Sequence, residues 1–429
     1  MNGIASELTS IVSFNNGVCL WADIPATLQQ NIGRAIAPGK SPSCIVYPQT
    51  QEELAAVIAC AYRNNWRVLS CGSGSKLGWG GLASNIDVVV STDCINKLIE
   101  HAVGDLTVTV EAGMKFSQLQ EIVNSDRQFI ALDPVASETA TMGGIVATGD
   151  TGSLRQRFGS IRDQLLGITF VRSDGEIAKA GGRVVKNVAG YDLMKLFTGS
   201  YGTLGIITQV TFRLYPMVDS SGTVVLTGDK SNISKAAATL RNSALTPQSA
   251  DLVNTEVVSS LSLGDGLGLI VRFQSIEESV KEQCNNLLAV GKDLGLTGVM
   301  VSGEEETSLW KRLSKLMDAS ANDSLITCKI GILPNKAVEV LTQLKLGRVN
   351  ITSGLGVLKF DGDIEKVLKA RSLCETNQGF LTILTAEAEV KKKLDVWGYK
   401  GNGLELMRKL KQQFDEKNIL SPGRFVGGI

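Results

Sequence analysis

Hydrophobic and polar positions alternate in short blocks through the first half of the chain. Residues 44–47 are apolar and are followed by a proline, which predicts a short buried strand. Thr50 and Glu53 form a capping-box pattern ahead of apolar residues at helical spacing, which predicts a helix. Residues 67–70 predict the next strand, so this stretch is expected to form a β–α–β unit.

Beyond this unit the hydrophobic pattern predicts mostly short strands up to about residue 217, and longer helices that alternate with strands after it. In the first half we expect strands at residues 87–91, 106–110, 165–172, 176–180 and 205–214, and a helix at residues 116–123. After about residue 217 glycine becomes rarer and longer helices alternate with strands. The helices are expected at residues 232–242, 277–294, 304–317 and 403–417, and the strands at 267–273, 298–301, 325–332 and 356–359. The fold class is therefore expected to be α+β, with a separate second domain.

The composition excludes several classes of protein. The chain has 429 residues, of which 43% are hydrophobic, and its 43 basic residues balance 43 acidic ones. A nucleic-acid-binding protein would normally carry a basic excess, and a disordered one would be less hydrophobic. No apolar run approaches the ~18 residues of a membrane span, and no secretory signal is recognisable. The eight cysteines form no CxxC pair, which predicts reduced thiols and a cytoplasmic location.

Histidine is almost absent, which restricts the possible chemistry. The single histidine, His101, excludes a multi-histidine metal site, and its neighbours indicate only a packing or surface role. A Gly-Lys-Ser triplet at residues 39–41 lacks the glycine that a phosphate-binding P-loop needs six residues before the lysine. We therefore expect neither a metal site nor a P-loop.

Glycine is abundant, and the first glycine-rich loop follows the strand predicted at residues 67–70. Gly72, Gly74 and Gly78 have a GxGxxxG spacing, but a strand at residue 87 follows where a Rossmann site needs a helix. Small side chains and free backbone amides can instead form an anion-binding concavity, to which Lys76 adds a positive charge. A plain turn between strands is the alternative interpretation.

A second segment of small residues covers residues 131–153, about 60 positions after the first. Two such segments, each between strands, could wrap around one extended cofactor. The alternative for Gly143 and Gly144 is the start of a helix that packs closely against a neighbour.

Five motifs occur in a characteristic order and carry a family resemblance. They are P-x-T-x-E-E-L at residues 48–54, G-S-G-S at 72–75, P…T-M-G-G at 134–144, G-Y-D-L at 190–193 and G-T-L-G-I-I-T at 202–208. This order resembles the FAD-binding domain of the vanillyl-alcohol oxidase/p-cresol methylhydroxylase (PCMH) family over residues 42–217. The closing S-P-G-R at 421–424 resembles the end of the family's D-2-hydroxy-acid members. The loop at residues 66–77 is similar to that of the FAD-binding E subunits of bacterial glycolate dehydrogenase (glycolate oxidase).

The resemblance implies a cofactor and the residues that bind it. The first loop would bind the FAD pyrophosphate, through Gly72, Ser73, Gly74, Ser75, Lys76 and Leu77. The second segment would line the flavin, through Pro134, Thr141, Gly143, Gly144, Thr148 and Gly149. The backbone of Gly205 and Ile207 would meet the adenine end. The first loop lacks the histidine to which several relatives attach flavin, and Cys71 is the only other candidate, so we expect non-covalent FAD.

The resemblance also implies the domain organisation. We expect an N-terminal segment at residues 1–41, a two-lobed PCMH-type FAD-binding domain at 42–217, and an α+β cap domain of the FAD-linked oxidase kind at 218–402. A C-terminal helix and tail at residues 403–429 would return to the FAD domain.

The catalytic residues are unknown from the sequence. Catalytic hydroxy-acid members of the family bind a metal through C-terminal histidines, and residues 218–429 contain none. Polar candidates for a general base are Arg183, Lys186, Tyr191 and Asp192, for which a structural role is favoured. Arg424 could hold a carboxylate or lie in an exposed tail.

Three hypotheses follow for the function. In the favoured one, the chain is the FAD-binding subunit of a glycolate (D-2-hydroxy acid) dehydrogenase complex. Its partners would be an FAD/metal subunit and an iron–sulfur subunit, with membrane attachment only through them. The alternatives are a self-sufficient FAD oxidoreductase without metal, and a scaffold that has lost its flavin.

Overall fold

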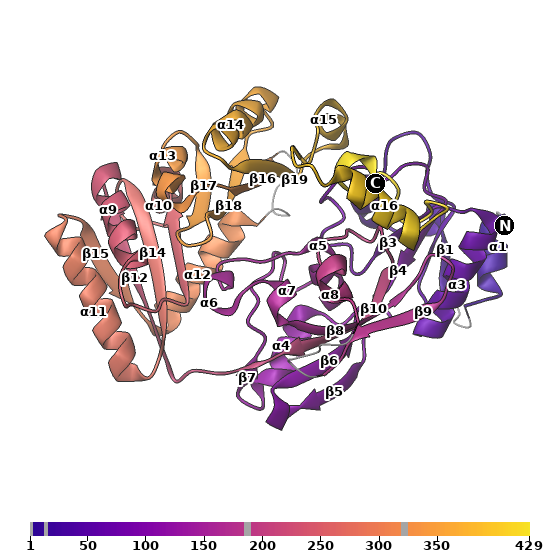
Figure 1. Cartoon of the computed structure of the whole chain (residues 1–429), viewed down its shortest axis with the longest axis horizontal. Coiled ribbons are helices and arrows are strands. Elements are labelled where there is room, and N and C mark those ends of the chain that lie inside the picture. Colours follow the sequence, from indigo (N-terminus) through magenta and orange to yellow (C-terminus); the bar gives the residue numbers. More distant parts are fainter. Residues whose placement is uncertain (1–2, 13–15, 184–189, 319–324) are drawn as a thin grey trace. The chain divides into compact units, whose positions relative to one another are not determined.

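The computed structural model describes residues 3–12, 16–183, 190–318 and 325–429. Within these ranges the chain forms two compact units (Figure 1). The first comprises residues 1–151, 160–216 and 387–429, and the second comprises residues 152–159 and 217–386. Helices and strands are mixed in both units, which confirms the α+β class. Compared with the expected domain ranges, residues 387–402 pack with the first unit and residues 152–159 with the second.

A small, mostly parallel sheet forms one lobe of the first unit. Its strand order is β1-β2-β4-β3, and β2, β4 and β3 are mutually parallel. The bounds are β1 (Val18–Leu20), β2 (Cys44–Val46), β3 (Val68–Cys71) and β4 (Val88–Ser91). Helix α3 (Gln51–Asn64) connects β2 to β3, and the hydroxyl of Thr50 caps it by accepting a hydrogen bond from the amide of Glu53. The predicted β–α–β unit is thereby confirmed.

A five-stranded antiparallel sheet forms the other lobe, in the order β5-β6-β10-β8-β9. The bounds are β5 (Leu98–Ala102), β6 (Thr107–Glu111), β8 (Leu165–Val171), β9 (Ile177–Gly181) and β10 (Ile206–Arg213). Phe170, Phe197 and Phe212 are fully buried in its core. Burying an aromatic side chain of this size contributes roughly 1.5–3 kcal/mol, so this core is a main source of the lobe's stability.

Short helices and one two-stranded ribbon complete the first unit. The helices are α1 (Gly3–Thr9), α2 (Ala26–Gly33), α4 (Phe116–Asn124), α5 (Met142–Thr148), α7 (Ile161–Gln164), α8 (Leu193–Phe197), α15 (Ala388–Lys393) and α16 (Leu404–Phe414). The ribbon pairs β7 (Gln128–Phe129) with β11 (Tyr215–Pro216).

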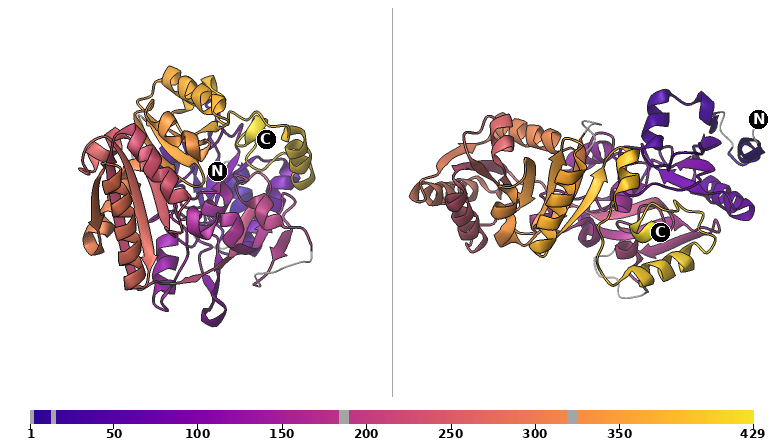
Figure 2. Two further views of the ribbon diagram at one scale, coloured as in Figure 1. Left: turned by 60° about the vertical axis from the view of Figure 1, so that its left-hand side comes forward. Right: turned by 90° about the horizontal axis from the view of Figure 1, so that it is seen from above.

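The second unit is built on an antiparallel eight-stranded sheet in the order β15-β12-β14-β13-β17-β18-β16-β19 (Figure 2). Its strands are β12 (Ser220–Gly228), β13 (Ser249–Val253), β14 (Leu267–Ser275), β15 (Thr297–Val301), β16 (Ile326–Gly331), β17 (Leu346–Asn350), β18 (Leu355–Phe360) and β19 (Phe380–Thr385). Its helices are α6 (Arg155–Phe158), α9 (Lys230–Arg241), α10 (Thr255–Ser260), α11 (Glu277–Asp293), α12 (Gly303–Met317), α13 (Ala337–Leu341) and α14 (Ile364–Thr376). The sequence pattern did not predict β12, β13, β17 or β19.

A buried ion pair fixes the C-terminal helix α16 within the first unit. The ammonium of Lys411 lies 2.6 Å from the carboxylate of Asp415 and donates hydrogen bonds to the carbonyls of Thr203 (2.9 Å) and Leu420 (2.8 Å). Asp415 in turn accepts from the amides of Ile419 (3.1 Å) and Leu420 (2.7 Å). The pair therefore joins the C-terminal residues 411–420 to the distant segment around Thr203.

Lys411→Met is expected to destabilise the fold by about 3–5 kcal/mol, because it leaves the carboxylate of Asp415 buried without its cation. Urea unfolding followed by circular dichroism measures this loss. Lys409→Met is the matched control, because Lys409 lies on the same helix and forms an exposed pair with Glu405. It should change stability by less than about 1 kcal/mol. Equal stabilities of the two variants would contradict the structural role of Lys411.

Candidate functional site

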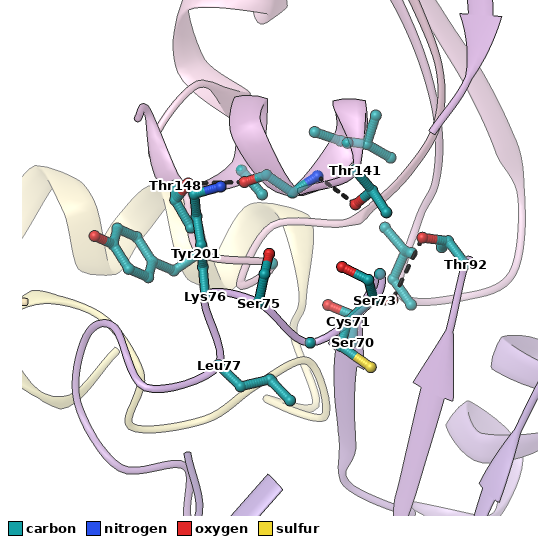
Figure 3. A pocket seen from close by; sticks show the side chains of 18 of the residues that line it. Ser70, Cys71, Ser73, Ser75, Lys76, Leu77, Thr92, Thr141, Thr148 and Tyr201 are labelled. Atoms are coloured by element: carbon teal, nitrogen blue, oxygen red, sulfur yellow. Dashed lines mark hydrogen bonds between the residues drawn. The ribbon is translucent and has the colours of Figure 1, made fainter. Parts of the chain in front are cut away.

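One cavity of about 680 Å³, including its open mouth, lies within the first unit (Figure 3). It is lined by the loop after β3, Thr92 directly after β4, helix α5 with its cap, the segment leading into β10 and the C-terminal tail. The lining residues are Ser70, Cys71, Gly72, Ser73, Gly74, Ser75, Lys76, Leu77, Thr92, Thr141, Gly143, Gly144, Ala147, Thr148, Tyr201, Gly202, Gly205, Ile206, Ile207 and Arg424. Five segments that are separate in the sequence thus meet at one concave site.

Two glycines give the first loop its shape. Gly74 has a φ of +83°, and its carbonyl accepts a hydrogen bond from the amide of Leu77 (3.2 Å), which closes a tight turn. A Cβ atom on Gly72 would overlap the side chain of Thr141 on the facing segment. The loop is therefore built for close backbone approach, both to a ligand and to the second segment.

The second segment begins a helix that faces this loop. Thr141 caps α5, and its hydroxyl accepts from the amide of Gly144 at 3.3 Å. Gly143 packs so closely on Ala112 that a side chain there would clash. In Figure 3 Thr141, the cap of α5, and Thr148, its last residue, lie above the loop that carries Ser73 and Lys76, and the side chain of Lys76 extends upward toward the helix. The two interpretations of Gly143 and Gly144 are thus compatible, because the helix start also forms part of the cavity wall.

Buried charge gives the cavity a mixed but mainly cationic lining. The ammonium of Lys76 forms an ion pair with Asp150 at 3.2 Å, and it has hydrogen-bonding capacity left. Both side chains are only 5% exposed. Asp150 also accepts a hydrogen bond from the amide of Val135 at 2.8 Å. A bound anion would find in Lys76 a cation that is already desolvated and held in place.

Arg424 is a second buried cation in the cavity wall. Its guanidinium donates to the carbonyls of Leu77 (2.9 Å) and Gly81 (3.3 Å), while its Nε has no hydrogen-bond partner. Burial lowers the pKa of Arg424 to about 10, and burial also raises the pKa of the neighbouring Tyr201. Arg424 is therefore buried and does not lie in an exposed tail. Two of its N–H groups already donate to carbonyls of the first glycine-rich loop, residues 71–81, which we call the glycine loop.

The thiol of Cys71 lines the cavity but is not activated. Burial raises its pKa to about 12. The thiolate is the nucleophilic form of cysteine, and at neutral pH this side chain stays a neutral thiol. The structure therefore offers no reactive cysteine at this position.

The structure brings together every residue implied for cofactor binding except two. Pro134 and Gly149 are not among the lining residues. The individual roles of all these residues remain predictions.

The polar residues considered as general bases lie elsewhere. Arg183 pairs with Glu100 at 2.5 Å on the surface, Tyr191 is 91% exposed, and Asp192 caps α8. Lys186 lies outside the described residues. His101 interacts with Gln128 and Asp126 on the five-stranded lobe and does not line the cavity.

Sequence reasoning missed several parts of the site. Thr92 lies in a segment without a motif. Asp150 lies within the second small-residue segment and Tyr201 directly precedes the G-T-L-G motif, but neither residue was named as part of the site.

Within the described ranges, no three histidine, cysteine, aspartate or glutamate side chains group closely enough to hold a metal ion. In the same ranges, no helix combines the length and apolar character needed to cross a membrane.

Comparison with known proteins gives the site a class. Residues 42–181 match the FAD binding domain family. The fold resembles that of p-cresol methylhydroxylase, with a TM-score of 0.74, 16% identity, and coverage of 99% of this chain and 96% of that one. It also resembles an alkyldihydroxyacetonephosphate synthase, with a TM-score of 0.70, 16% identity, and coverage of 98% and 86%. The chain therefore carries an FAD-binding domain and has the PCMH-type fold, which confirms the resemblance seen in the motifs.

Curated relatives narrow this class. The glycolate oxidase subunit GlcD of Bacillus subtilis is 23% identical over 425 residues, which cover 89% of this chain and 88% of that protein. A D-lactate dehydrogenase of Archaeoglobus fulgidus is 33% identical over 175 residues, or 41% of this chain and 39% of that protein. The chain is thus an FAD-binding oxidoreductase with relatives among the glycolate oxidases and D-lactate dehydrogenases.

The residues present fit FAD. A diphosphate needs convergent donors and close backbone approach, which Gly72 and Gly74 permit. Lys76 and Arg424 place two buried cations beside that loop, and each has a nitrogen without a hydrogen-bond partner. The cofactor implied by the family therefore has a matching cradle in this chain.

Proposed function

We propose that this chain is the FAD-binding subunit of a D-2-hydroxy acid dehydrogenase or oxidase complex, with glycolate as the substrate that the complex oxidises to glyoxylate. The observation that carries the proposal is the cavity formed between the glycine loop and helix α5. In this cavity, glycines allow the cofactor's diphosphate to approach the protein backbone closely, and the buried cations Lys76 and Arg424 lie beside them. When bound, FAD would supply the acceptor for a hydride and its electron pair.

Each part of the cavity is proposed to bind a different part of FAD. The loop from Gly72 to Leu77 would hold the pyrophosphate with its amides, its hydroxyls and the Lys76 ammonium. Thr141 and Thr148 would line the flavin from α5, and Pro134 and Gly149 would act only through the backbone around them. Gly205 and Ile207 would meet the adenine through main-chain groups.

The substrate class is supported by the relatives. Both the glycolate oxidase subunit and the D-lactate dehydrogenases are named for small 2-hydroxy acids. Oxidation of such an acid needs the carboxylate held and the hydroxyl proton removed, in addition to the flavin. The described cavity would supply the flavin site, and its lining contains no histidine, aspartate or glutamate that could take the hydroxyl proton.

Dependence on partner chains follows from the residue inventory. The whole sequence has one histidine, and it lies on the five-stranded lobe away from the cavity. We therefore infer that a partner carries the metal and the substrate, and that an iron–sulfur chain passes electrons onward. The complex would be cytoplasmic, with any membrane attachment made through the partners. A self-sufficient flavoenzyme is the second candidate, and a flavin-free scaffold the third.

Gently purified protein is expected to show the absorption bands of an oxidised flavin. Acid precipitation should release this colour into the supernatant, because the thiol of Cys71 is protonated at neutral pH and the loop holds no histidine. Spectra of the supernatant and the pellet measure both points. Colour that stays in the pellet would contradict non-covalent binding. Folded protein that is colourless and takes up no added FAD would support the scaffold instead.

A further inference from the structure

A lysine from the C-terminal segment lies buried against the outer side of the glycine loop. Lys391 is on helix α15 and is only 6% exposed. Its ammonium donates hydrogen bonds to the carbonyls of Gly78 and Gly80, the latter at 3.0 Å. Fully buried lysines are rare unless they are paired, and here the acceptors are two backbone carbonyls of a single turn.

Together with Arg424, this lysine holds a whole stretch of loop backbone. Arg424 takes the carbonyls of Leu77 and Gly81, and Lys391 takes those of Gly78 and Gly80. A loop whose amides converge on an anion must have its carbonyls satisfied elsewhere. Lys391 and Arg424, two buried cations from the C-terminal segment, satisfy the carbonyls of residues 77–81, which directly follow the proposed anion-binding part of the loop.

The charge of Lys391 has a cost in the cofactor-free protein. Burial, together with the smaller effect of the nearby cations Arg424 and Arg34, lowers the pKa of Lys391 to about 7. The acceptors of its ammonium are neutral carbonyls. An anion bound on the loop would offset this cost and favour the charged lysine.

We propose that Lys391 is a positioning residue for the cofactor, which fixes the turn at residues 78–80 and adds positive potential to the diphosphate site. The proposal rests on the proposed FAD site but assigns a role to a residue outside its lining. Lys391 touches neither FAD nor substrate. It acts through the loop that does.

The first test is the FAD affinity of the flavin-free full-length chain, measured by quenching of FAD fluorescence. Lys391→Met should raise the Kd for FAD at least about tenfold, because it removes the positive charge and the donor of the hydrogen bonds to both carbonyls. Lys391→Gln, which keeps a donor without the charge, should show a smaller loss. Lys392→Met is the matched control. Lys392 is the next residue, is exposed and pairs with Glu389, so the Kd should stay within about twofold of the parent.

The pH dependence of affinity separates positioning from general stability. In the free parent Lys391 loses its proton as the pH rises through about 7, so its FAD affinity should fall between about pH 6.5 and about pH 8.5. The charged groups facing Lys391 are the guanidinium groups of Arg424 and Arg34, and burial lowers the pKa of Arg424 only to about 10, which is above this window. Cys71 and Tyr201, which face Arg424, also have raised pKa values. Lys391→Met and Lys391→Gln should therefore flatten the profile.

The outcomes distinguish this inference from the proposed function. If the parent binds FAD and Lys391→Met binds it equally well with the same pH profile, the positioning role is wrong and the FAD site stands. If the parent binds no FAD, the proposed function itself fails. Circular dichroism checks that the variants fold. Should the methionine variant not fold, the affinity and pH profile of Lys391→Gln decide the question.

Discussion

Replacing Gly74 with valine is expected to abolish flavin retention while leaving most of the secondary structure in place. Gly74 has a φ of +83°, a region that a β-branched residue adopts only with strain of about 1–3 kcal/mol. A side chain would also occupy the space through which the cofactor's phosphates must approach the backbone. Together these effects should raise the Kd for FAD at least roughly thirtyfold, as measured by fluorescence quenching and by flavin absorbance after gel filtration.

A second glycine provides a matched control for this variant. Gly295 has a φ of +68° with no atom close enough to clash with a side chain, and it lies in the second unit between α11 and β15. Gly295→Val therefore carries similar backbone strain without touching the cavity. It should lose stability but retain FAD. If Gly74→Val binds FAD as tightly as the parent, the loop is not the pyrophosphate site.

The isolated chain is expected not to oxidise glycolate or D-lactate at an enzymatic rate. General acid–base help is typically worth about 10²–10⁴-fold, and orientation of the substrate can be worth more. No histidine, aspartate or glutamate that could act as a general base lines the described cavity. His101, the sole histidine of the sequence, is hydrogen-bonded to Gln128 and lies elsewhere. Turnover should therefore lie several orders of magnitude below that of a complete enzyme.

A dye-reduction assay on the purified, flavin-loaded chain measures this, first alone, then with divalent metal, and then with the proposed partner subunits. Activity is expected only in the full mixture. Supplying the Gly74→Val chain in that mixture tests whether this flavin lies on the path of the electrons, while the Gly295→Val chain serves as control. Strong turnover by the single chain would overturn the subunit proposal and favour the self-sufficient enzyme.

Local pattern was sufficient to predict much of the first unit. The capping of α3 by Thr50, the β8–β9 hairpin and the long strand β10 all follow from signals within a few residues. Helix α5 was harder to predict, because a run of Gly, Thr, Ser and Ala carries no hydrophobic period. It forms because Thr141 caps it and because Gly143 can pack on Ala112.

The sequence by itself determined the fold class and the two glycine-bearing segments, because these depend on residue type and short spacing, and the order of its motifs carried the family resemblance that implied FAD. Only the tertiary structure decided which side chains bind the carbonyls of the glycine loop. Lys391 and Arg424 bond carbonyls more than 300 residues earlier in the chain. No local signal encodes such a contact, since its energy exists only once the C-terminal segment has returned to the first unit. The same holds for Lys411, whose charge is tolerated in the interior because Asp415, the nearby carbonyl of Leu420 and the distant carbonyl of Thr203 surround it there.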